Sequence, residues 1–169
     1  MADRYKTLNA GKDTMVEATV ASTGIGEAGD IVALDATGKL DPSVLPTGVG
    51  PDVKILEAFE NLAAGDYINI FDDGGTEKAR LADNSNSRPA HAWVNAAVTA
   101  TNNATIFFEG ANANFAGLTP GARIYLGTAG GVITVPLDPA VDVGDIHQLL
   151  GVAIDATSVN TDIDDCVQL

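Results

Sequence analysis

The chain has 169 residues, of which 23 are acidic and 9 are basic, so its formal charge at pH 7 is −14. Contact with nucleic acid backbones requires clustered lysine and arginine, and a membrane span requires about 18 consecutive apolar residues. The sequence has neither feature, so we expect no nucleic acid partner and no membrane partner. Its single cysteine, Cys166, excludes an internal disulfide and a cysteine-based zinc site.

Residues 1–52 are expected to form an extended N-terminal arm. Small residues dominate 21–29, and three prolines between 42 and 51 exclude a helix there and withhold backbone donors from a central strand. Asp30–Asp35 predicts one short strand, and Ile31–Leu34 is expected to add to the sheet of another molecule. The apolar residues are too scattered for a core of their own, so we expect the arm to contact a neighbouring molecule through Tyr5, Leu8, Ile25, Ile31, Val32, Leu34, Leu40, Val44 and Leu45.

Residues 53–169 are expected to form a single domain of short strands. Turn signals recur at strand-like intervals, and two of them, 72–75 and 127–131, have the chemistry of hairpin loops. The segment 53–64 also fits one amphipathic helix, because its apolar residues would share a face, and the sequence leaves this alternative open. The predicted strands are 53–59, 66–71, 77–82, 91–98, 104–109, 122–126, 131–135, 146–154 and 159–167.

Many short strands separated by frequent turns predict an all-β fold, either a small β-barrel or a compact β-sandwich. Aspartate outnumbers glutamate by 17 to 6 and the chain has 18 glycines, a composition that suits turns better than helix interiors. The residues expected to supply much of the core are Tyr67, Ile70, Trp93, Val94, Phe107, Ile124, Leu126, Ile133, Val152 and Ile154.

No motif in the chain predicts catalysis, a cofactor or a metal ion. Gly24–Gly29 matches the dinucleotide pattern G-x-G-x-x-G, but it lacks the preceding strand and following helix that such a site needs. The aspartates at 162, 164 and 165 lack the spacing of a calcium loop, and Asp162 and Asp164 are expected to share one solvated strand face. His91 and His147 lie in separate predicted strands, without a hydrolase or zinc-protease motif. We therefore expect a protein that is not an enzyme.

Several short segments resemble the capsid decoration, or cement, proteins of tailed bacteriophages. The most specific are Gly117–Leu126 (GLTPGARIYL), which is similar to a hairpin of that family, and Gln148–Ala153 (QLLGVA), which is similar to a later strand. Shorter similarities occur in the same order at 64–70, 73–76, 90–94 and 108–110. The stretch 36–46 is instead similar to segments of phage tail-fibre and other virion proteins, so a fibre or minor adhesion protein is the alternative.

The resemblance implies a structural virion protein that binds the outer surface of a bacteriophage capsid. Its partners would be the major capsid protein, whose lattice it would reinforce, and further copies of itself, most often as homotrimers. Members of the family are small β-barrel domains, which agrees with the fold expected from the strand pattern. The arm of about 50 residues departs from the usual family pattern and is expected to make its own contacts with capsid or neighbouring subunits.

Overall fold

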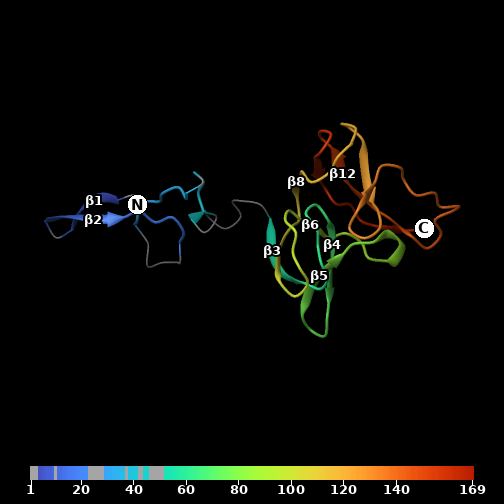
Figure 1. Cartoon of the computed structure of the whole chain (residues 1–169), viewed down its shortest axis with the longest axis horizontal. Helices are drawn as coiled ribbons and strands as arrows, with labels where there is room; N and C mark the ends of the chain where they lie inside the picture. The colour runs from blue at the N-terminus through green and yellow to red at the C-terminus, as the bar shows by residue number, and fades with distance from the viewer. Residues whose placement is uncertain (1–3, 10, 23–28, 37, 42–43, 46–51) are drawn as a thin grey trace. The chain divides into compact units, whose positions relative to one another are not determined.

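A computed structural model describes residues 4–9, 11–22, 29–36, 38–41, 44–45 and 52–169 (Figure 1). The chain divides into two compact units, Met1–Gly50 and Pro51–Leu169, called here unit 1 and unit 2. Predicted contact residue Ile25 lies outside the described residues. None of the described helices is long and apolar enough to cross a membrane.

Unit 1 contains a β-hairpin that was not expected from the sequence. Strands β1 (Arg4–Asn9) and β2 (Lys12–Glu17) pair antiparallel, with Arg4 opposite Glu17 and Asn9 opposite Lys12. The predicted strand at Asp30–Asp35 does not form, and only Val32 makes a bridge, which runs parallel to Thr19. The arm therefore pairs with itself at residues 4–9 and 12–17, where the sequence predicted no strand. Neither strand, RYKTLN or KDTMVE, alternates apolar with polar residues, so the sequence carries no strand signal of that kind here.

Unit 2 is all-β and begins with a closed five-stranded barrel, which confirms the predicted fold class. The strands run in the order β3-β5-β4-β6-β7, and a parallel pair between β3 and β5 helps to close the barrel. The first segment is a strand, so the alternative of a helix at 53–64 is wrong. The barrel strands are β3 (Val53–Ala58), β4 (Tyr67–Asp72), β5 (Glu77–Leu81), β6 (Ala92–Val94) and β7 (Asn103–Phe107).

A five-stranded antiparallel sheet follows the barrel and lies beside it in unit 2 (Figure 1). Its order is β10-β9-β12-β13-β8, and a separate two-stranded sheet pairs β11 with β14. A short 3-10 helix, η3 (Asn84–Asn86), lies between β5 and β6 in the chain. The strands are β8 (Gly110–Asn112), β9 (Arg123–Leu126), β10 (Val132–Ile133), β11 (Ile146–His147), β12 (Leu149–Ala153), β13 (Val159–Thr161) and β14 (Val167–Gln168).

Both predicted hairpins are present, one joining β4 to β5 and the other joining β9 to β10. The predicted strands at 146–154 and 159–167 are each divided in two, and β8 was not predicted at all. The strand predicted at 159–167 ends at residue 161, so Asp162 and Asp164 lie in irregular chain, although both are solvent-exposed as expected.

The core of unit 2 has three parts: one inside the barrel, one between the barrel and the sheet, and a small one within the sheet, made of Ile124, Ala153 and Val159. Residues of both layers form the second part: Tyr67, Ala82, Ala90, Trp93, Leu126 and Leu150. Tyr67, Trp93, Val94, Ile124 and Leu126 are buried as predicted, whereas Ile70, Phe107 and Ile133 are half-buried.

Val152 and Ile154 were expected in the core and are instead exposed. The structure buries Leu150 and Ala153 in that part of the chain. The cause is a shift in pairing register between β12 and β9, located between Leu149 and Gly151. Because alternate side chains of a strand point to opposite faces, an irregularity of one residue reverses which of them faces the core.

Candidate functional site

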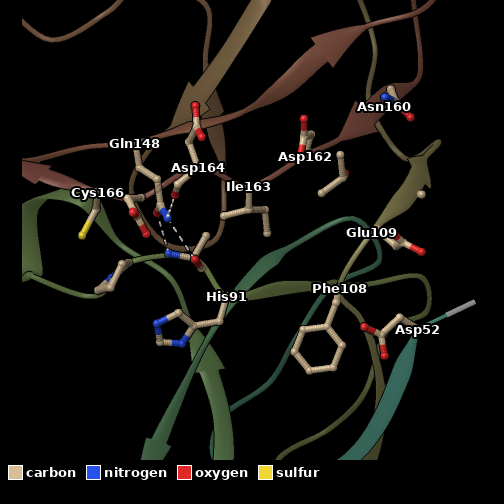
Figure 2. Close-up of a pocket in the computed structure, with 15 residues that line it drawn as sticks. Asp52, His91, Phe108, Glu109, Gln148, Asn160, Asp162, Ile163, Asp164 and Cys166 are labelled. Atoms are coloured by element: carbon tan, nitrogen blue, oxygen red, sulfur yellow. Dashed lines mark hydrogen bonds between the residues drawn. The ribbon is translucent and has the colours of Figure 1, made fainter.

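A groove of about 830 Å³ opens on unit 2 where the barrel meets the sheet (Figure 2). Segments that are distant in the sequence line it, namely Asp52, 89–91, 108–110, Gln148 and 160–166. We call this the acidic groove.

Gln148 holds together the segments that meet at the groove. Its side chain is 3% exposed, and its Oε1 accepts a hydrogen bond from the backbone N–H of Ala90 at 2.7 Å. Its Nε2 donates to the carbonyl oxygens of Ala90, at 3.0 Å, and of Asp164, at 2.9 Å (Figure 2). A buried amide with all these partners satisfied fixes its neighbours in place. Gln148 therefore ties the chain before β6 to the segment that carries the groove's aspartates.

Two further buried polar contacts join the barrel to the sheet near the groove. The Tyr67 hydroxyl lies 3.1 Å from Thr161 Oγ1, and Asn112 Nδ2 donates to the Gly65 carbonyl at 2.9 Å. Burial raises the pKa of Tyr67, while its hydrogen bonds with Thr161 and Asn112 act in the opposite direction. The groove thus stands on a rigid support, because each of these polar groups has a partner in the other layer.

Carboxylates dominate the charge of the groove. Five acidic side chains line it, and no lysine or arginine does: Asp52, Glu109, Asp162, Asp164 and Asp165. Backbone N–H groups of Asp162 and Asp164 donate to Leu150 and Leu149, which holds this acidic segment alongside β12. The apolar side chains of Phe108 and Ile163 also line the groove. The arrangement suits non-covalent binding of positively charged groups attached to an apolar or extended segment.

His91 stands on the wall of the groove, and its Nδ1 accepts a hydrogen bond from the Ile70 backbone N–H at 3.0 Å. His147 does not line the groove and packs against Tyr125 instead, with ring centroids 4.9 Å apart. The described residues contain no cluster of three or more His, Cys, Asp or Glu side chains arranged to hold a metal ion. Cys166 lines the groove as an exposed free thiol.

Acidification below pH 6.5 is expected to destabilise the protein through His91. Burial lowers the pKa of His91 from its usual 6.5, and the positive charge of Arg80 lowers it further. The unfolded chain therefore binds a proton first as the pH falls, so the free energy of unfolding decreases between pH 6.5 and the folded-state pKa and is unaffected above pH 6.5.

The measurement is urea unfolding at pH 7.5 and pH 5.5. We expect the wild type to lose more stability between these values than His91→Gln does. Val141→Asn, at an exposed side chain that does not titrate, is the control and should retain the wild-type pH dependence. An equal loss of stability in His91→Gln and in the wild type would contradict the assignment of this pH dependence to His91.

Eight of the nine contact residues predicted in the arm lie among the described residues. Tyr5 is half-buried, donates its hydroxyl proton to Asp30 Oδ1 at 3.4 Å and accepts from the Ile31 N–H at 3.3 Å. Leu8 is 70% exposed, and Val44 and Leu45 are half-buried. The remaining four described residues are exposed: Ile31, Val32, Leu34 and Leu40. Five of the predicted contact residues thus keep their apolar side chains exposed within the described part of unit 1.

The sequence did not predict the groove or the role of Gln148, because both depend on contacts between segments far apart in the chain. Comparison of the chain with models of protein families, with curated proteins and with solved structures finds no match.

Proposed function

We propose that this protein is a structural component of a bacteriophage virion that binds the outer surface of the capsid and reinforces the lattice of the major capsid protein, as a homotrimer. The segments that resemble decoration proteins support this function, and so does the all-β fold of unit 2 with its small barrel. The strongly negative charge suits an exterior position better than contact with packaged DNA.

The observation that carries the proposal is the uncovered apolar surface of unit 1. A two-stranded hairpin is at best marginally stable alone, yet no other described residue of unit 1 forms a strand against either outer edge of β1–β2. Leu8 and Met15 project from the hairpin, and Ile31, Val32 and Leu34 lie exposed in the chain that follows. A marginally stable hairpin gains stability when its apolar residues are buried against a partner. A capsid surface offers a large and fixed area for such burial.

Deleting residues 1–50 is expected to weaken binding to empty capsids at least tenfold, which corresponds to a loss of about 1.4 kcal/mol. Unit 2 has its own core, so the truncated protein should remain folded. Binding is measured by co-sedimentation with capsids over a range of protein concentrations, and copy number in virions by densitometry.

A second variant retains the arm and replaces its exposed apolar residues, Leu8→Asn with Leu34→Asn. It should show a weakening comparable to the deletion. Val141→Asn, at a side chain 75% exposed in unit 2, is the matched control and should bind as the wild type does. Unchanged affinity after deletion would show that the arm is not a contact, and absence of wild-type binding to any capsid would overturn the proposed function.

A further inference from the structure

Two arginines lie together on the outside of the barrel, in a position fixed by a buried amide. Arg80, in β5, has its guanidinium carbon 4.2 Å from the centroid of the Phe71 ring, and its Nε donates to Asn69 Oδ1 at 2.9 Å. Asn69 is 4% exposed, and its Nδ2 donates to the Pro89 carbonyl at 2.8 Å. That second bond places Arg88, the residue before Pro89, beside Arg80. We call Arg80 and Arg88 the arginine pair.

The arginine pair has no carboxylate partner within the described residues, although the chain has more than twice as many acids as bases. The lysines of unit 2 behave differently, because Lys54 pairs with Glu77 and Lys78 pairs with both Glu57 and Asp73. The charge of Glu60 acts on Arg80 without forming an ion pair with it, and Glu60 Oε1 accepts a hydrogen bond from the Leu81 N–H.

Neither burial nor the neighbouring arginine favours the charged form of Arg80. Burial lowers the pKa of Arg80, the charge of Arg88 lowers it further, and Glu60 acts in the opposite direction. Both side chains are partly exposed, so they are accessible to another molecule. Guanidinium groups bind carboxylates through two parallel hydrogen bonds, and stacking on an aromatic ring preorganises them for that contact. The pair therefore fits carboxylates from another molecule.

The acidic groove of a second copy supplies the matching chemistry. Residues 138–169 contain seven acids and no base, and three of those acids lie within four residues, at 162, 164 and 165. All three are exposed and line the groove, in which Figure 2 labels Asp162 and Asp164. Backbone hydrogen bonds from Asp162 and Asp164 to β12 hold their segment in place.

The two surfaces are neighbours on unit 2. Pro89 follows Arg88 in the chain, accepts the hydrogen bond from Asn69 and lines the groove, so it connects the two surfaces. A contact between two different surfaces of identical subunits forms a closed ring when the rotation between them closes, and otherwise forms a filament.

We propose that the arginine pair of one copy binds the carboxylates of Asp162, Asp164 and Asp165 in the groove of a second copy, and that this contact closes a ring. The inference rests on the proposed function, since it supplies the contact by which its homotrimer would form. It requires neither unit 1 nor a capsid, so it can be tested on the free protein.

The test is sedimentation velocity of the full-length chain at several concentrations, with charge-reversed variants. Arg80→Glu with Arg88→Glu, and separately Asp162→Lys with Asp164→Lys, should each weaken self-association at least tenfold. The variant that combines all four substitutions restores opposite charges across the contact and should recover the oligomer. Arg123→Glu, at an exposed arginine of β9 outside the pair, is the matched control and should associate as the wild type does.

Because Arg80 packs on Phe71, Arg88→Glu alone serves as a second variant, and circular dichroism verifies that each protein is folded. A wild type that is monomeric at every concentration, or variants that associate unchanged, would overturn the inference. A folded four-substitution variant that remains dissociated would also overturn it. Capsid co-sedimentation separates the two proposals. A wild type that forms the charge-dependent ring but binds no capsid overturns only the proposed function. A monomer that binds capsids overturns the ring and the homotrimer but leaves the proposed capsid binding intact.

Discussion

Replacing Trp93 with alanine is expected to lower the free energy of unfolding by about 3–5 kcal/mol, the usual cost of removing a large buried aromatic side chain. Trp93 lies in β6, is 4% exposed and belongs to the core between the barrel and the sheet. Its ring stacks on Phe107 with centroids 4.9 Å apart, and its Nε1 donates to the Glu109 carbonyl at 3.4 Å. The substitution would leave a cavity and also an unsatisfied carbonyl near the groove.

The measurement is urea unfolding of the full-length protein at pH 7.5, followed by circular dichroism. Val141→Ala is the control, because Val141 is exposed and its truncation should change stability by less than about 0.5 kcal/mol. A loss below about 1 kcal/mol for Trp93→Ala would mean that its side chain is not buried between the two layers. The position of the groove, which depends on those layers, would then need to be reconsidered.

The two hairpins of unit 2 could be predicted because their turns are specified by local chemistry. In the first loop Asp72 Oδ1 accepts from the Gly75 N–H at 3.0 Å, and Gly74 has a φ of 65°, which glycine adopts without the strain other residues incur. In the second, Gly130 has a φ of 77°, and the Gly131 N–H donates to the Thr128 carbonyl at 3.0 Å within the loop. Glycine and aspartate in these positions indicate a turn whatever the rest of the chain does.

Other features depend on distant contacts and leave no local signal. Strand β8 (Gly110–Asn112) contains no β-branched or aromatic residue, and it is a strand because β13 pairs with it. The exposed positions of the groove aspartates could be predicted from their charge, but their proximity to residues 89–91 could not. The same limit applies to Gln148, whose sequence neighbours give no indication that its amide bonds to Ala90.

Gly151→Ala is expected to destabilise unit 2 by about 3 kcal/mol or more, because two unfavourable effects combine. A Cβ at residue 151 would lie 2.1 Å from the Asn160 carbonyl oxygen, a backbone atom on the neighbouring strand β13. Overpacking of this kind costs about 1–3 kcal/mol. Gly151 also has a φ of 147°, outside the range that other residues adopt easily, and such strain adds about 1–3 kcal/mol.

Gly74→Ala separates the two effects, because Gly74 also has a positive φ but has nothing within 4 Å of its Cβ position. We expect it to cost about 1 kcal/mol, and the difference between the two variants in urea unfolding measures the close approach of β12 to β13. That approach occurs beside the register shift that turns Val152 outward and Ala153 inward. If Gly151→Ala destabilised the protein no more than Gly74→Ala, β12 and β13 would not pack this closely. A pairing register of β12 that places Val152 in the core would then have to be considered again.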